Sequence, residues 1–426
     1  NAIVDLCDEA IEDLPYLKEK PSTRITYHSK ESAATLKAMT LLYAASPLFN
    51  GNKMFANFLN KNGERLFPDY DKEKWRKAAE AADEAIKICE AAGKTLVTGN
   101  TDRPTKLLNI MKDIEDSALA PDYKNSEAIF YVRNTSGGPC GYILPFFAGE
   151  GEGADCYDPH SIGCLGASMK MVEMFYTEHG VPISEDKQWV VAKYSMGRES
   201  DEKYTNVLNL NTEILGLHRR REPRFYAAIL YNHRVIPSLS DDKNIRNEWS
   251  TGRQKDGFGR AELYLGGAAR PSINYANYSK TGMLVFKRND PQADMYNRAY
   301  PQNYACTYIR YAEILLDYIE ALSNYDPTNA DIRKYWDQIR KRAGVESAFV
   351  ATPEIASDPA LMHEYIIRER QIELCFEGDR YFTTRRLWKA HTPDKIVTDP
   401  VTGQEKDGRI YGDGGSMWGM NVGAGD

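Results

Sequence analysis

The sequence predicts a mainly α-helical protein in which helical hairpins at both ends of the chain support a large, irregular, loop-rich middle region. Apolar residues recur at helical spacing near both ends, whereas the middle is rich in Gly, Asn, Asp, Pro and aromatic residues. The 42% hydrophobic and 27% charged residues are ordinary for a globular protein. We expect helical hairpins over residues 1–138, the irregular region over 139–300, and helical hairpins with a tail over 301–426, folded as one compact unit.

Two helices are expected before residue 50. Ile3, Leu6 and Leu14 recur at helical spacing, and the prolines that follow end this first helix. Ser29 is a typical N-cap residue, so a second helix is expected to begin after it and to end before Pro47. Both helices belong to the expected N-terminal hairpins.

The clearest helix is expected over Asp71–Gly93, with Gly93 as its C-terminal stop. Its alanines would let another helix approach closely. The Trp-x-x-Ala-Ala-x-x-Ala spacing is similar to that of tetratricopeptide hairpins, so we expect stacked, tetratricopeptide-like hairpins. The apolar stripe consists of Trp75, Ala78, Ala79, Ala82, Ile86 and Cys89.

The C-terminal part is expected to hold further helical hairpins, since apolar residues again recur at helical spacing. In the middle region only short elements can be placed. The expected C-terminal helices cover Tyr308–Leu322, Asn329–Arg342, Leu361–Phe376 and Arg380–Lys389. The expected middle elements are short helices at Met169–Tyr176 and Glu213–Arg220 and strands at Phe225–Leu230 and Met283–Lys287.

Charge and composition exclude several classes of function. Lys and Arg total 54 against 61 for Asp and Glu, and the net charge of −7 disfavours nucleic acid as a partner. No stretch approaches the roughly 20 apolar residues that span a bilayer. The glycines from Gly149 to Gly153 superficially match a dinucleotide-binding loop, but Asp155 and Pro159 follow where a helix would have to begin. We therefore expect no cofactor.

The cysteines indicate neither a zinc site nor a disulfide framework, because there are seven of them, they are scattered, and no CxxC pair occurs. Cys156 and Cys164 flank a loop and could form a disulfide in an oxidising compartment, which the sequence leaves open. An acidic loop around Glu150 could hold calcium, but a solvated loop is favoured and we expect no metal site. Four cysteines in periodic segments are expected to be buried: Cys7, Cys89, Cys306 and Cys375.

The sequence contains no signature of a hydrolase, since neither an H-E-x-x-H nor a G-x-S-x-G motif occurs. Glu369 and Glu373 lie on one expected helix and could be a catalytic carboxylate pair. Pairing of these carboxylates with Arg370, Arg380 or Arg385 is the favoured interpretation. We expect a protein that is not an enzyme.

Aromatic residues in a Gly-rich stretch of the middle region form the candidate binding site. Flat rings can stack on the apolar face of a sugar, while Asn, Asp and Arg side chains can bond its hydroxyls. Between Asp241 and Thr281 these residue types are interleaved. For any single ring, packing under its own loop is the favoured role, whereas for the cluster as a whole packing and ligand contact are both open, so this stretch is the candidate site. The candidate ligand-binding residues are Trp249, Arg253, Tyr264, Asn274, Tyr275, Asn277 and Tyr278.

Six stretches, in order along the chain, resemble motifs of the SusD/RagB family. Among them, Ile339–Val345 is similar to the family's I-R-x-R-A-G turn, and Ile366–Tyr381 is close to its E-R-x-x-E-L-x-F-E-G-x-R motif. The resemblance implies a helical protein with tetratricopeptide-like hairpins that scaffold an irregular ligand-binding half. The other four stretches are Glu173–Pro182, Arg221–Tyr226, Lys280–Lys287 and Tyr308–Ala321.

The same resemblance implies a function. Members of the family are cell-surface lipoproteins of the Gram-negative outer membrane that capture nutrients for a SusC-like TonB-dependent transporter. We therefore expect a glycan-binding protein that captures oligosaccharides for import, with membrane contact only through a lipid anchor outside this chain. A peptide-capturing member of the family is the nearest alternative, and a helical glycoside hydrolase is a further one.

Overall fold

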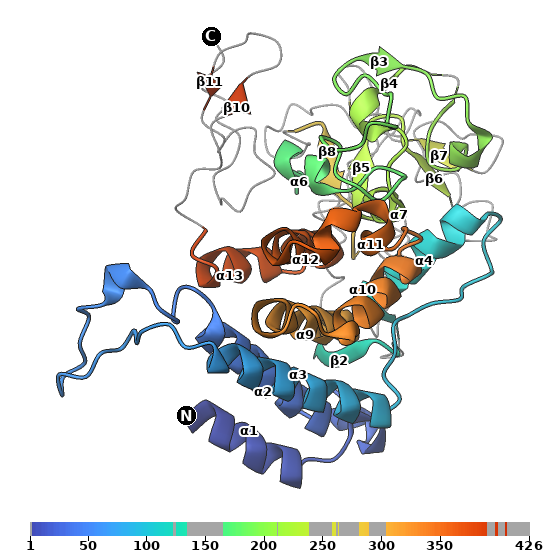
Figure 1. The fold of residues 1–426 in the computed structure, drawn as a ribbon. Coiled ribbons are helices and arrows are strands. Elements are labelled where there is room, and N and C mark those ends of the chain that lie inside the picture. Colours follow the sequence, from blue (N-terminus) through green and yellow to red (C-terminus); the bar gives the residue numbers. More distant parts are fainter. Residues whose placement is uncertain are drawn as a thin grey trace, which may run out of the picture.

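A stack of helices forms one side of the molecule, and short strands and turns form the other (Figure 1). The computed structural model describes residues 2–121, 125–133, 165–210, 212–237, 258–260, 263, 281–288, 304–389, 397–398 and 405–406. The expected region boundaries at 138 and 300 lie outside these residues. The described helices are α1 (Ala2–Asp13), α2 (Lys30–Ala45), α3 (Glu73–Ala91), α4 (Lys106–Ala118), α6 (Met169–Met174), α7 (Pro223–Ala228), α9 (Tyr311–Tyr325), α10 (Ala330–Arg342), α11 (Ala348–Ala351), α12 (Pro359–Glu373) and α13 (Asp379–Arg386).

The long helices begin where the sequence places their capping residues. Ser29 precedes α2, and its backbone N–H donates to Ser32 Oγ at 2.8 Å in a capping box. Asn329 Oδ1 accepts from the backbone of Asp331 at 3.0 Å before α10. Asp358 caps α12 in the same way and is followed by Pro359 at the first helical position. The expected helices at both ends of the chain are therefore confirmed to within a few residues.

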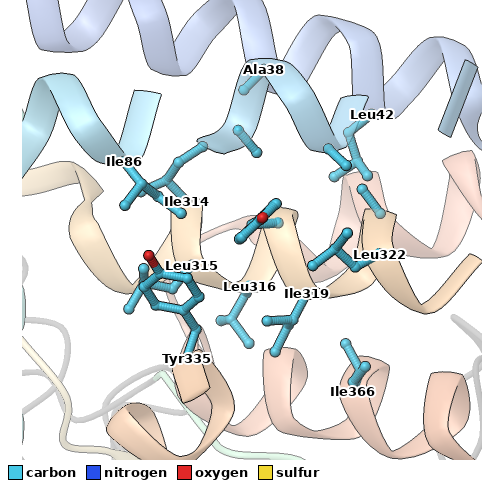
Figure 2. Packing of buried hydrophobic residues seen from close by; sticks show 14 of the residues in the cluster. Ala38, Leu42, Ile86, Ile314, Leu315, Leu316, Ile319, Leu322, Tyr335 and Ile366 are labelled. Atoms are coloured by element: carbon cyan, nitrogen blue, oxygen red, sulfur yellow. The ribbon is translucent and has the colours of Figure 1, made fainter. Parts of the chain in front are cut away.

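The main core lies where α3 packs between α2 and α9 (Figure 2). Ala82 and Ala85 on α3 are almost fully buried, which lets the three helix axes approach closely. Ile86, Leu315 and Ile319 fill the space that the small residues leave between the helices. In the layered view of Figure 1, α1 is outermost, and α9 with α10 separates α2 and α3 from α12 and α13.

A three-stranded antiparallel sheet joins α4 to α9. Its strand order is β1-β9-β2, with Leu119 opposite Cys306 and Tyr131 opposite Thr307. Tyr308 was expected on a helix but lies in β9, because the β-favouring run from Thr307 to Ile309 pairs with β2 before α9 begins. These strands are β1 (Leu119–Pro121), β2 (Ala128–Arg133) and β9 (Tyr304–Arg310).

The loop-rich half contains α6, α7 and two-stranded antiparallel sheets. The strand expected at Met283–Lys287 is confirmed as β8, and the helix expected at Met169–Tyr176 as α6. The strand expected at Phe225–Leu230 is wrong over most of its length, because Pro223 begins helix α7, which leads directly into β5. The helix expected at Glu213–Arg220 is a short strand followed by a 3-10 turn. The strands are β3 (Met196–Gly197), β4 (Ile214–Leu215), β5 (Ile229–Tyr231), β6 (Val235–Pro237), β7 (Phe258–Arg260), β8 (Met283–Val285), β10 (Val397–Thr398) and β11 (Glu405–Lys406).

Burial agrees with the expectation for the cysteines that the structure describes in full. Cys7, Cys89 and Cys375 are buried free thiols, and burial raises the pKa of Cys89 to about 12. Cys156 and Cys164 lie outside the described residues. None of the described helices is both long and apolar enough to cross a lipid bilayer.

Replacement of Ala85 by Leu tests the close packing of α3. Ala85 is fully buried against α2 and α9, so the larger side chain should lower the free energy of unfolding by about 1–3 kcal/mol through overpacking. Urea unfolding followed by circular dichroism measures this. Ala91→Leu, at the exposed end of the same helix, is the matched control and should change stability little. Equal stability of the two variants would contradict this packing.

Candidate functional site

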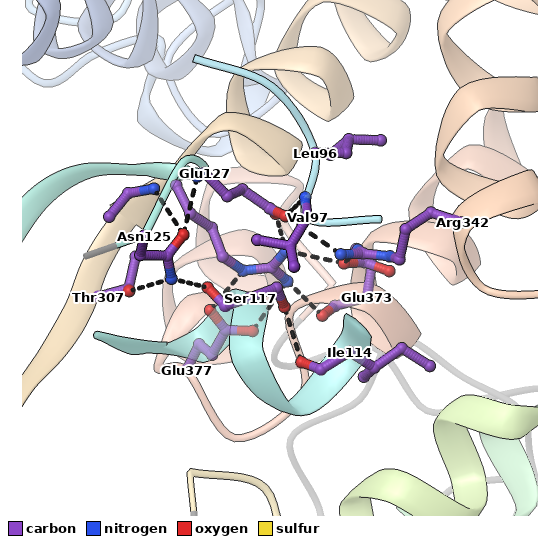
Figure 3. A network of polar contacts seen from close by, with 12 residues as sticks. Leu96, Val97, Ile114, Ser117, Asn125, Glu127, Thr307, Arg342, Glu373 and Glu377 are labelled. Atoms are coloured by element: carbon purple, nitrogen blue, oxygen red, sulfur yellow. Dashed lines mark hydrogen bonds and ion pairs between the residues drawn. The ribbon is translucent and has the colours of Figure 1, made fainter. Parts of the chain in front are cut away.

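A buried network of arginine and glutamate side chains lies where the helical stack meets the loop-rich half (Figure 3). Arg310, the last residue of β9, places Nη1 2.6 Å from Glu127 Oε1 and 2.8 Å from Glu373 Oε1. Its Nε lies 2.8 Å from Glu377 Oε2. Arg342, from α10, contacts the same Glu127 and Glu373 from the other side. The network thus joins β2, β9, α10 and α12 at one point.

Glu369 and Glu373 on α12 form ion pairs with arginines that are distant in the sequence. Glu369 lies 2.6 Å from Arg224 Nη1 and 2.9 Å from Arg340 Nη1, while Trp336 Nε1 donates to it at 3.0 Å. The expected arginine pairing is therefore confirmed, but the partners expected for it were wrong. Arg370 is turned toward Asp317 and Asp379 instead, and neither Glu369 nor Glu373 pairs with Arg380 or Arg385 in the described contacts.

The surroundings of these carboxylates oppose acid catalysis. Burial alone would raise the pKa of Glu373, but Arg342, Arg310 and Arg224 outweigh it and hold that pKa well below the ordinary value of 4.5. The pKa of Glu377 falls to about 2 for a similar reason, with Arg310 and Lys287 beside it. The side chains of Glu373 and Glu377 are 2% and 6% exposed and are ionised at neutral pH, so they can neither donate a proton nor reach a substrate. Their chemistry is that of a scaffold.

Two buried arginines hold the loop-rich half together and connect it to the scaffold. Arg224 bridges Glu222 and Glu369, and so connects α7 to α12. Arg221 donates to the carbonyl oxygens of Val172 and Phe175 at 2.8 and 2.7 Å, where α6 ends. A guanidinium can satisfy several carbonyls at once because its five N–H donors form a rigid fork. Arg224 therefore holds α7 on the scaffold, and Arg221 holds the end of α6 beside α7 within the loop-rich half.

The consecutive strands β5 and β6 hold both ends of a segment that carries most of the predicted ligand-binding residues. On one side, β6 pairs with β7, with Val235 opposite Arg260. On the other side, β5 pairs with β8, with Tyr231 opposite Met283. The backbone N–H of Leu263 also donates to Asn232 Oδ1, in the turn between β5 and β6, at 3.1 Å. The chain between β7 and β8 therefore begins and ends on the same small frame.

The candidate ligand-binding side chains lie outside the described residues, and so does the acidic loop around Glu150. Their contacts with a ligand stay a prediction. The structure describes the strands that anchor the segment: β5 and β6 with their partners β8 and β7. Within the part of the chain that the structure describes, no group of three or more His, Cys, Asp or Glu side chains is arranged to hold a metal ion. The seven candidates are Trp249, Arg253, Tyr264, Asn274, Tyr275, Asn277 and Tyr278.

The sequence reasoning missed one cluster of aromatic residues. Phe49, Phe55, Phe58 and Phe67 gather in the connection between α2 and α3, and the Phe55 and Phe67 ring centroids are 4.8 Å apart. The signal was present, because four of the 14 phenylalanines fall between residues 49 and 67. It was overlooked because these rings lie outside the Gly-rich middle of the chain, where composition favours a ligand site.

The fold, and the arginine–glutamate network that joins its two halves, define a class of protein. It is a tetratricopeptide-like helical scaffold that carries a loop-rich half. The sequence matches the SusD family over residues 125–414. The chain belongs to the SusD family. No curated protein matches it.

Solved structures with the same fold support this assignment. BT4246 is 21% identical, with a TM-score of 0.70 over 91% of this chain and 65% of that protein. A SusD-like protein from Bacteroides fragilis is 22% identical, with a TM-score of 0.58 over 91% of this chain and 59% of its own. A SusD-like carbohydrate binding protein from Bacteroides fragilis is 17% identical, with a TM-score of 0.53 over 94% and 64%. The chain thus spans 59–65% of the length of these three proteins.

Replacement of Glu373 by Gln tests the ion network. The change leaves Arg310 and Arg342 buried beside a neutral group, which should cost about 3–5 kcal/mol of unfolding free energy at pH 7. Because the pKa of Glu373 is lowered, its contribution is present above pH 4.5 and is lost as the pH falls further. Urea unfolding at pH 7 and pH 3 should therefore show a smaller difference between variant and wild type at pH 3. Glu364→Gln, on the exposed face of α12, is the control, and a difference that grew at pH 3 would contradict the assignment.

A second buried cluster holds more carboxyl groups than guanidinium groups. Arg370 Nη2 lies 2.7 Å from Asp379 Oδ1 and 3.5 Å from Glu313 Oε1, while its Nη1 contacts Asp317. Arg386, on α13, pairs with Glu320, which lies on α9 together with Glu313 and Asp317. Burial, and then the charge of Asp317, raises the pKa of Glu313 above its ordinary value of 4.5.

Glu313→Gln should therefore change how stability depends on pH. The wild type keeps a proton on Glu313 that the unfolded chain releases, so its unfolding free energy should fall as the pH rises above 4.5. The variant lacks this titration and should be the more stable protein at pH 8 and equal to the wild type near pH 4. Thermal unfolding across this range, with the exposed Glu354→Gln as control, measures the effect. A variant that loses stability at pH 8 would refute it.

Proposed function

We propose that this protein binds oligosaccharides at the outer face of the outer membrane and delivers them to a SusC-like TonB-dependent transporter. Membership of the SusD family supports a role in nutrient capture. One structural relative, from Bacteroides fragilis, is a SusD-like carbohydrate binding protein, which favours a glycan as the nutrient. Attachment to the membrane through a lipid anchor outside this chain is part of the same proposal.

The observation that carries the proposal is the frame that holds the aromatic segment. Backbone pairs of β6 with β7 and of β5 with β8 anchor both ends of the chain that carries Tyr264, Tyr275 and Tyr278. Anchored ends lower the conformational entropy that the segment loses when it binds a ligand. A ring stacked on a sugar contributes on the order of 1 kcal/mol, so a few such contacts give an affinity that suits capture followed by release.

No chemical step is assigned to the protein. The carboxylate pair that could have suggested a glycosidase, Glu369 and Glu373, is buried among arginines and serves the scaffold. A reducing-sugar assay with candidate polysaccharides should therefore show no turnover.

Substitution of Trp249 and Tyr264 by Ala tests the proposed site. Each change should weaken oligosaccharide binding by about five-fold, because each removes a stacking surface and leaves the frame intact. Isothermal titration calorimetry against ligands chosen from a glycan array measures the affinity. Tyr27→Ala removes a Tyr that is 63% exposed on the helical half and is the control.

Two results would overturn this site. Undiminished binding after loss of both rings would place the ligand elsewhere. Binding to a peptide pool with no signal on the glycan array would favour the alternative of a peptide-capturing family member.

A further inference from the structure

The connection between α2 and α3 projects from the helical half (Figure 1). Several of its apolar side chains are exposed to solvent. We call residues 49–70 the apolar protrusion. It is the blue loop that reaches away from the helices at the left of the figure. Its exposed apolar side chains, with their exposed fractions, are Met54 (72%), Phe58 (57%), Leu59 (52%), Leu66 (50%) and Tyr70 (61%).

The protrusion has a defined shape. Its two arms pair through Leu66 N–H, which donates to the carbonyl of Phe58 at 3.1 Å. Asn60 closes the turn between the arms, since its Oδ1 accepts from the backbone of Asn62 and Glu64 at 2.8 and 3.0 Å. A surface that is ordered before binding loses little entropy when it docks.

Aromatic packing connects the protrusion to the scaffold. Trp388, which closely follows α13, meets the ring of Phe55 edge-on with centroids 5.3 Å apart. The backbone N–H of Leu48 donates to the carbonyl of Arg386 at 2.9 Å. The protrusion is therefore held at both its base and its centre.

The exposed area is large enough for a specific contact. At about 200 Å² for a large side chain, five such side chains at half exposure present on the order of 500 Å². This matches the largest apolar patches of monomeric proteins, which are often functional. It is also more than half of the roughly 800 Å² that one partner contributes to a standard interface.

The chemistry of the protrusion selects the kind of partner. Four of the five side chains lack a hydrogen-bonding group that could meet a sugar hydroxyl. The outermost turn, Asn60–Glu64, is polar, so the tip would enter a lipid layer with its polar groups first, which is costly. A protein surface that packs against the side of the protrusion meets neither difficulty.

The charged side chains of the protrusion further restrict the kind of protein that can dock on it. Arg65 is paired with Asp69 at 3.1 Å, so the other charged side chains at the rim are the exposed Lys53, Lys61 and Glu64, with a net charge of +1. A second copy of the chain in a symmetric contact would bring these lysines toward one another. A partner with carboxylates around an apolar centre is complementary.

We propose that the apolar protrusion docks on an apolar, acid-rimmed surface of the transporter. This inference rests on the proposed function, which supplies the partner, and it assigns the contact to residues of the helical half. Ligand contact and transporter contact then use separate parts of the chain.

Binding of the purified chain to the detergent-solubilised SusC-like transporter of the same organism tests the inference. The double variant Phe58→Ser, Leu66→Ser should bind at least ten-fold more weakly, because it removes two apolar anchors. Lys61→Glu, in the exposed turn, should also weaken binding, more strongly at low salt. Val350→Ser, at a 55% exposed position on α11, is the control and should bind as the wild type does.

Each outcome decides a different point. Unchanged affinity of the double variant and of Lys61→Glu overturns the docking surface and leaves the transporter partnership standing. Absence of wild-type binding overturns both. If the double variant loses oligosaccharide affinity, the surface binds the ligand and the inference is wrong. If the wild type self-associates and the double variant does not, the surface binds a second copy of the chain and the inference is likewise wrong. Should the double variant fail to fold by circular dichroism, Lys61→Glu decides, since its side chain is exposed at the tip of the turn.

Discussion

A guanidinium group taken out of water needs carboxylates or carbonyl oxygens as partners, because the desolvation penalty is several kcal/mol per ion even in a relaxed protein. Arg310 and Arg342 meet this requirement with Glu127 and Glu373, which come from strands and helices far apart in the chain. Arg224 does the same with Glu369 across the boundary between the two halves. The positions of β2, β9, α7, α10 and α12 are thereby tied to one another. The irregular half is fixed in place by charge pairing as well as by apolar contact.

The helical part of the fold could be predicted because its information is local. The alanine-rich stripe of α3 and the caps at Ser29 and Asn329 act over a few residues, and periodicity makes them visible. The partners of Glu369 could not be found in this way. Arg224 lies far from it in sequence, and helical spacing favoured the near arginines, which the tertiary structure directs to other acids. Strand and helix were confused at Phe225 because a short apolar run has no decisive period.

Composition could suggest the proposed binding region but not the strands that anchor it. The Gly-rich, aromatic stretch from Asp241 to Thr281 is distinguished by its residue types alone. That β7 pairs with β6, and β8 with β5, is a long-range fact that no local pattern encodes. Short strands of three residues carry too little periodicity to be recognised. The family motifs predicted the helical scaffold with its loop-rich half. The pairing of β5 with β8 and of β6 with β7 came from the structure.

The anchors of the aromatic segment consist mainly of main-chain hydrogen bonds, and this has an evolutionary consequence. Such bonds do not depend on which side chains occupy the stretch between β7 and β8. Adding or removing residues there costs little, since closure entropy grows only slowly with length. Mutation can therefore replace the aromatic residues between β7 and β8 while Arg224, Arg310 and their carboxylates stay unaltered. Under the proposed function, adaptation to a different nutrient requires substitutions in this segment alone, while the helical scaffold is retained.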